Sequence, residues 1–137
     1  MLRLGKEFAV VAGLTLAGVA FSLVSGLAAP PWRPPPPEPG EIRLPEARAL
    51  DPIWIDARPR QAYEKAHIPG AIHLNANTWE TGVGGLMDAW LPDPRPIVVY
   101  CDSEACGTSE RVAADLRESL PDAQIYTLKG GWSAWPQ

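Results

Sequence analysis

A short apolar run that ends at a cysteine limits most strongly what this chain can fold into. Residues 97–100 read Ile-Val-Val-Tyr and follow the proline-interrupted segment 92–96. A run this short, β-branched and aromatic, and bounded by prolines, predicts a buried strand of a parallel sheet rather than a helix. Cys101 follows directly, at the expected end of that strand.

The residues after this cysteine predict an amphipathic helix. Val112, Leu116 and Leu120 recur at four-residue spacing, with charged residues between them. Thr108 or Ser109 is placed to cap the helix at its start. The cysteine therefore lies between a strand end and a helix start, where free backbone N–H groups attract anions and favour thiolate over thiol.

Composition excludes several classes of function. The chain has 137 residues with a formal net charge of -4 and no run rich in Lys or Arg, so we expect no nucleic-acid partner. Two cysteines and two distant histidines are too few ligands for an evident metal site, and we expect neither a metal nor a cofactor.

The first 29 residues predict a membrane anchor. Residues 8–29 carry no charge, which is long enough to cross a hydrocarbon core, and Arg3 and Lys6 precede them. These features favour a transmembrane helix, or signal anchor, that spans residues 1–29, with the rest of the chain on the extracytoplasmic, periplasmic side. The alternative is a signal peptide cleaved after a small-x-small site at 26–28, which would release the same domain into the periplasm or medium.

A stiff spacer and a single domain follow the anchor. Seven of the ten residues from 30 to 39 are proline, so segment 30–40 is expected to be extended. In segment 41–137, short apolar runs typical of strands alternate with patterns typical of helices. This alternation predicts an open α/β sheet with sites at the carboxyl ends of its strands. We expect strands near 42–44, 53–56, 71–74, 97–100 and 125–128, and helices near 45–50, 59–65 and 79–91, after 108 and at 132–135.

Segment 41–137 contains an ordered series of motifs: Trp54-Ile55-Asp56-Ala57-Arg58, His67-Ile68-Pro69-Gly70-Ala71-Ile72-His73-Leu74, Val98-Val99-Tyr100-Cys101, Ser109 with its helix, and Leu128-Lys129-Gly130-Gly131-Trp132-Ser133-Ala134-Trp135. These motifs resemble those of the single-domain rhodanese family, and the anchor and spacer before them resemble those of its membrane-anchored bacterial members. The resemblance implies a rhodanese-like, mainly parallel five-stranded sheet flanked by helices. It also implies a sulfurtransferase in which Cys101 carries a persulfide sulfur from a small donor to a thiol acceptor.

The resemblance also implies that the loop after the cysteine cradles the anionic part of the substrate with its main-chain N–H groups. Those loop residues are Asp102, Ser103, Glu104, Ala105, Cys106, Gly107 and Thr108.

That loop departs from the form Cys-x-x-Gly-x-Arg-Ser of many active rhodaneses. The interval from the cysteine to Ser109 is two residues longer and contains no Arg or Lys, while Asp102 and Glu104 are acidic. Carboxylates disfavour the thiolate and repel an anionic donor, which argues against thiosulfate as the natural substrate. Arg111, at the helix start, partly compensates for this charge.

Cys106 leaves two interpretations open. It resolves an oxidised or persulfidated Cys101 by forming a disulfide, or it is a small loop residue without chemistry. The first interpretation supports an alternative function, a non-catalytic or redox-sensing binding module on the rhodanese scaffold.

The polar residues at the other strand ends are expected to have structural roles. Asp56 is expected to cap the next helix or to anchor Arg58 in a buried ion pair. His67 is expected to be a hydrogen-bonded residue of its turn rather than a base for the thiol.

Overall fold

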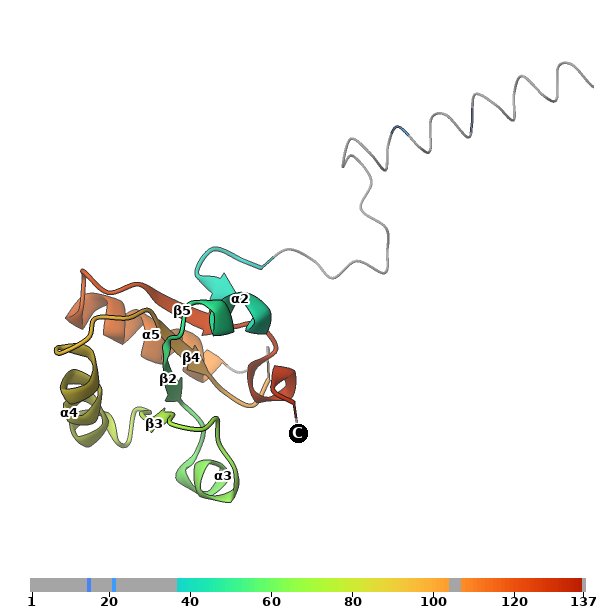
Figure 1. The fold of residues 1–137 in the computed structure, drawn as a ribbon. Helices are drawn as coiled ribbons and strands as arrows, with labels where there is room; N and C mark the ends of the chain where they lie inside the picture. The colour runs from blue at the N-terminus through green and yellow to red at the C-terminus, as the bar shows by residue number, and fades with distance from the viewer. Residues whose placement is uncertain (1–14, 16–20, 22–36, 104–106, 137) are drawn as a thin grey trace, which may run out of the picture. The chain divides into compact units, whose positions relative to one another are not determined.

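A computed structural model describes residues 15, 21, 37–103 and 107–136 of the chain (Figure 1). The folded unit begins at Pro37. Its centre is a five-stranded, fully parallel sheet in the order β1-β5-β4-β2-β3. The strands are β1 (Glu41–Ile42), β2 (Ile53–Asp56), β3 (Ile72–His73), β4 (Ile97–Tyr100) and β5 (Ile125–Leu128).

Helices cover both faces of this sheet (Figure 1). They are α2 (Leu44–Ala49), α3 (Arg60–Lys65), α4 (Trp79–Trp90), α5 (Gly107–Ser119) and the 3-10 turn η1 (Gly131–Ala134). Because successive strand residues point to opposite faces, β4 contributes to two cores. Ile97 and Val99 pack with residues of α4 and α5, whereas Val98 and Tyr100 pack with α2 and η1. The predicted α/β architecture, a five-stranded parallel sheet flanked by helices, is therefore confirmed for the described part of the chain.

The start of α5 corrects one expectation. We expected Thr108 or Ser109 to cap the helix and Gly107 and Thr108 to belong to the loop, but α5 already includes all three residues. Ser109 is buried against the core, and Glu110 places a carboxylate in the first turn, which suits the positive end of a helix. The loop after Cys101 is thus shorter than expected.

The predicted anchor over 1–29 lies outside the described residues except for Thr15 and Phe21. Within the part of the chain that the structure describes, no helix has the length and apolar character needed to cross a bilayer. The anchor over 1–29 and the spacer over 30–36 therefore stay predictions, whereas residues 37–40 of the expected spacer belong to the folded unit.

One edge of the sheet carries a charge pair whose effect on stability should depend on pH. The Glu41 carboxylate accepts hydrogen bonds from the N–H of Glu38 (2.8 Å) and from Nζ of Lys129 (3.0 Å). The N–H of Glu38, followed by Lys129, holds the pKa of Glu41 below its ordinary value. A carboxyl group with a lowered pKa stabilises the fold above its unfolded pKa, and this contribution is lost as the pH falls through the folded pKa.

We therefore expect Glu41→Gln to lower the free energy of unfolding at pH 7 by up to about 1 kcal/mol. The difference from wild type should shrink as the pH falls below about 4.5, the ordinary glutamate value. Urea unfolding of the full-length chain, followed by tryptophan fluorescence between pH 3 and 7, measures both effects. Glu64→Gln, which removes the carboxylate of an exposed pair with Arg60, is the matched control. A difference that stays constant across this pH range would contradict the assignment.

Candidate functional site

Cys101 lies at the carboxyl end of the central strand β4. Alternation along the strand directs it to the same face as Val99, toward the core that includes Val112 and Ala113 of α5. Cys101 is only 1% exposed and is disulfide-bonded. Its Sγ lies 3.4 Å from the carbonyl oxygen of Ser103. The sulfur must therefore be reduced and gain access to a donor before it can react.

The Gly130–Gly131 turn holds the backbone of this cysteine in place. Trp132 donates its main-chain N–H to the carbonyl oxygen of Cys101 (2.6 Å), and the Ser133 hydroxyl donates to the carbonyl oxygen of Asp102 (3.1 Å). Gly131 has φ +54°, and a Cβ at this position would collide with the Cys101 carbonyl oxygen. Glycine is required here both by the backbone conformation and by the close approach of two chain segments.

A buried polar network lies on the other face of the sheet at the same strand ends. Arg58 is 4% exposed and forms a bidentate pair with Asp56, Nε to Oδ1 at 3.0 Å and Nη2 to Oδ2 at 2.7 Å. Tyr100 donates its hydroxyl to Oδ2 of the same carboxylate (2.7 Å) and accepts the N–H of Ile68 (3.1 Å). The expected ion pair of Asp56 with Arg58 is therefore present in the structure.

This network alters the proton affinities of two of its members. Burial raises the pKa of Tyr100, and the hydrogen bond to Asp56 raises it further against the opposing N–H of Ile68. Burial by itself would lower the pKa of Arg58, but the hydrogen bonds and charge of Asp56 outweigh burial and raise it. At neutral pH Arg58 is charged and Tyr100 is a neutral hydrogen-bond donor.

Arg58 also connects this network to the loop that follows Cys101. Its Nη1 lies 3.8 Å from Oδ1 of Asp102, whose side chain is 62% exposed. Its guanidinium lies 4.4 Å from the ring centroid of Trp132, the residue that bonds the Cys101 carbonyl. From sequence we assigned Arg58 to a buried ion pair and did not place it beside the acidic loop, because Arg58 and Asp102 follow different strands. The placement of both after adjacent parallel strands is the signal that could have revealed it.

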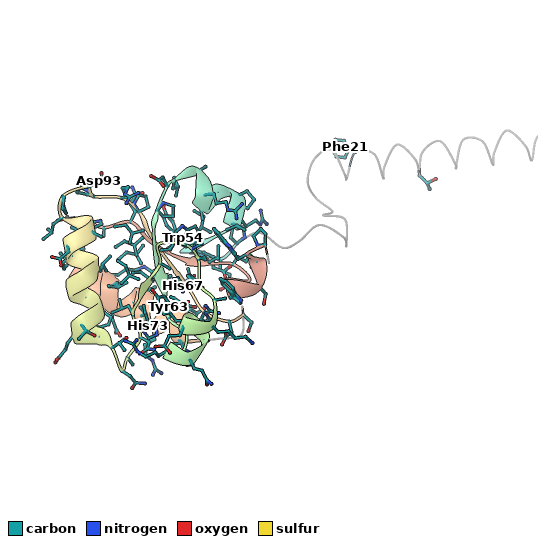
Figure 2. All side chains as sticks on the ribbon, turned by 60° about the horizontal axis from the view of Figure 1, so that its bottom comes forward. Phe21, Trp54, Tyr63, His67, His73 and Asp93 are labelled. Atoms are coloured by element: carbon teal, nitrogen blue, oxygen red, sulfur yellow. The ribbon has the colours of Figure 1, made fainter. Side chains whose placement is uncertain are left out.

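Both histidines make main-chain hydrogen bonds. His67 Nδ1 lies 2.9 Å from the carbonyl oxygen of Tyr63, and the two rings stack at 4.0 Å. His73 Nε2 lies 2.8 Å from the carbonyl oxygen of Arg58. Figure 2 shows His67 and His73 gathered around Tyr63. The described residues hold no cluster of three or more metal-ligating side chains.

The remaining predicted loop residues divide into two groups. Asp102, Ser103, Gly107, Thr108 and Arg111 are placed, and all are exposed. Glu104, Ala105 and Cys106 lie outside the described residues, so the structure does not test the proposed Cys101–Cys106 pairing. Cys106 is the other cysteine of the sequence.

Shallow hollows lie next to the placed residues. One of about 390 Å³ is lined by Ala76, Gly107, Thr108, Arg111, Val112 and Asp115. A second of about 230 Å³ shares Ala76 and Thr108 with it and extends to Ala57. A further hollow of about 220 Å³ is not next to these residues. It is lined in part by Pro96 and lies at the amino-terminal end of the strands, away from Cys101.

One known protein resembles this chain in sequence, and one solved structure resembles it in fold. A tRNA sulfurtransferase of Desulfurococcus amylolyticus is 33% identical over 81 residues, which cover 59% of this chain and 14% of that protein. The crystal structure of the BH2092 protein from Bacillus halodurans matches with a TM-score of 0.50 and 23% identity, over 66% of each chain. The chain thus corresponds to a small part of the curated relative, and the likeness to the solved structure supports the fold.

The family comparison covers the whole region that contains the site. The model of the Rhodanese-like domain matches residues 43–137. This range contains the carboxyl ends of β2, β3, β4 and β5. Cys101 lies at the end of the central strand of this region. The chain belongs to the rhodanese family.

Proposed function

We propose that this protein is a rhodanese-type sulfurtransferase in which Cys101 carries sulfane sulfur, as a persulfide, to a thiol or another acceptor. The observation that carries the proposal is the position of Cys101 at the carboxyl end of β4 within a rhodanese-like domain. The glycine turn that fits against its carbonyl group supports a site with a defined backbone geometry. The sulfurtransferase name of one relative agrees with the reaction class.

The reaction consists of two displacements at sulfur. The thiolate of reduced Cys101 attacks the outer sulfur of a donor R–S–S–H, which forms Cys101–S–S–H and releases R–S⁻. An acceptor thiolate then attacks the outer sulfur of Cys101–S–S–H and regenerates the Cys101 thiolate. Each step exchanges one sulfur–sulfur bond for another. The disulfide-bonded Cys101 of the structure first requires a dithiol reductant.

Intact mass spectrometry tests this function directly. We expect the full-length chain, reduced with a dithiol and freed of excess reagent, to gain the mass of one sulfur when a thiol persulfide is added. Peptide mapping should locate that sulfur on Cys101, and a thiol acceptor should remove it. If no donor class, thiosulfate included, adds sulfur to the reduced chain, the proposed function is wrong.

A second function, a redox-sensing binding module, is favoured by the state of the cysteine. Cys101 is disulfide-bonded and almost inaccessible, as expected for a thiol that stores an oxidation state. In this alternative a mild oxidant such as a peroxide converts the reduced Cys101 thiolate to a sulfenic acid, and the Cys106 thiol attacks that sulfur, which forms the disulfide and releases water. Loss of two hydrogens after mild oxidation, without any sulfur adduct from any donor, would favour this module over the sulfurtransferase.

We also propose that segment 1–29 anchors the domain of 41–137 to a membrane through the spacer 30–40, with the domain on the extracytoplasmic side. The uncharged stretch 8–29 after Arg3 and Lys6 supports this location. A small sulfur donor and a thiol acceptor would be its partners. Release of the chain from membranes by alkaline carbonate would argue against the anchor.

A further inference from the structure

Two neighbouring residues of η1 hold the two carbonyl groups at the start of the loop after β4. The main-chain N–H of Trp132 donates to the carbonyl oxygen of Cys101 (2.6 Å), and the hydroxyl of Ser133 donates to the carbonyl oxygen of Asp102 (3.1 Å). Both carbonyl groups therefore point toward η1. Neither hydrogen bond involves a sulfur atom, so both are available to the protein when Cys101 is reduced.

These two bonds also fix the direction of the N–H groups that follow. None of the peptide bonds among the described residues is cis. In a trans peptide unit the C=O of one residue and the N–H of the next point in opposite directions. The N–H groups of Asp102 and Ser103 therefore point away from η1, and neither donates a hydrogen bond within the described part of the chain.

The side of the loop that faces away from η1 is the side of the sulfur. Trp132 packs with Tyr100 against the core on one face of the sheet, whereas Cys101 belongs to the core on the other face, with Val99 and Val112. The two N–H groups and the Cys101 side chain thus lie on the same side of the loop backbone. Successive main-chain N–H groups that share a direction favour an anion in front of them. When Cys101 is reduced, that anion is its thiolate or its persulfide.

We propose that Ser133 is a positioning residue for the sulfur chemistry of Cys101. Its hydroxyl holds the peptide unit between Asp102 and Ser103, so that the Ser103 N–H faces the anionic sulfur. Trp132 makes the neighbouring bond with its main chain, which no change of side chain removes. Ser133 uses a side chain, and its substitution therefore isolates the effect of one held peptide unit.

The composition of the loop makes this device important. Residues 102–108 contain no Arg or Lys, so the loop itself supplies no cationic side chain to the thiolate. Main-chain N–H groups are then the donors that the loop offers, and their direction decides how well they stabilise a negative sulfur. The consequence for sulfur transfer rests on the proposed function, whereas the effect on the Cys101 thiolate does not.

Alkylation of Cys101 tests this role without any sulfur transfer. The protein is the reduced, full-length chain with Cys106→Ser, in which Cys101 is the remaining thiol. Its rate of reaction with iodoacetamide is measured from about pH 5 to about pH 10, because the thiolate is the reactive form. We expect Ser133→Ala to slow the reaction about fivefold on the rising part of this profile, the effect of one hydrogen bond, and to move its midpoint to higher pH. Ser133→Thr, which keeps the hydroxyl, should retain the profile of the parent protein.

Ser119→Ala is the matched control. Ser119 is exposed like Ser133, and its hydroxyl also donates to a main-chain carbonyl oxygen, that of Asp115 (2.9 Å), but at the C-terminal end of α5. Both alanine variants should lower the urea midpoint of unfolding by a similar, small amount, and only Ser133→Ala should shift the pH profile. A merely structural bond would change the rate at high pH, where the thiol is fully ionised, and leave the midpoint of the profile in place.

The role of Ser133 and the proposed function fail in different ways. An unchanged midpoint in Ser133→Ala, an equal shift in Ser119→Ala, or a shift that Ser133→Thr does not restore would overturn the positioning role and leave the proposed function standing. With a thiol persulfide as donor, Ser133→Ala should lower kcat about fivefold and change KM little. If the reduced chain takes up no sulfur from any donor while the alkylation result holds, the proposed function is wrong and Ser133 still positions the loop.

Discussion

Replacement of Cys101 by serine is expected to abolish sulfur uptake by the full-length chain. A serine hydroxyl remains protonated at neutral pH, and its oxygen cannot extend a sulfur chain, so no persulfide forms at this position. We expect the rate of transfer from a thiol persulfide to fall by at least about 10³-fold, to the uncatalysed background. The measurement is the mass gain of one sulfur on the reduced protein, together with the rate of thiol release from the donor.

Cys106→Ser is the matched control for this loss. Sulfurtransferase chemistry at Cys101 predicts that Cys106→Ser still gains sulfur, whereas a redox pair predicts that either substitution abolishes the two-hydrogen loss on oxidation. Unchanged transfer in Cys101→Ser would remove the cysteine from the reaction. The rhodanese-like fold would be unaffected by that result, because fold and chemistry are separate inferences.

Replacement of Asp56 by asparagine is expected to cause the largest loss of stability. The substitution keeps the size of the side chain but leaves the 4% exposed Arg58 guanidinium without its countercharge. It also replaces the carboxylate that accepts the hydrogen bond of the Tyr100 hydroxyl by a weaker acceptor. Tyr100 is fully buried. Removing one partner of a buried ion pair costs about 3–5 kcal/mol. We expect a decrease of about 3 kcal/mol in the free energy of unfolding, measured by urea denaturation of the full-length chain at pH 7.

Asp93→Asn provides the control for this experiment. Asp93 pairs with Arg95 across 3.1 Å, but the two side chains are 71% and 36% exposed. Pairs this exposed contribute about 0–1 kcal/mol, so the same chemical change should have little effect there. A loss in Asp56→Asn no greater than that in Asp93→Asn would show that the buried pair is not a main support of the strand ends.

Several elements were predictable because their causes are local. The strands Ile53–Asp56, Ile97–Tyr100 and Ile125–Leu128 have the predicted bounds, since short apolar runs between turn residues can be identified from neighbouring residues alone. The first turn of α5 was predicted less well. Ser109 has the side chain of a capping residue, yet it lies inside the helix and against the core. Tertiary packing decided its position, and a local capping preference could not show this.

By itself, the sequence determined the α/β class, the order of strands and helices, and the position of Cys101 at a strand end. These follow from hydrophobic periodicity and from motifs within a few residues of one another. Only the tertiary structure decided that Arg58 lies beside Asp102 and that Cys101 is buried. The physical reason is that these features depend on contacts between segments distant in sequence. Such contacts form when the sheet and its helices pack, and no local pattern encodes them.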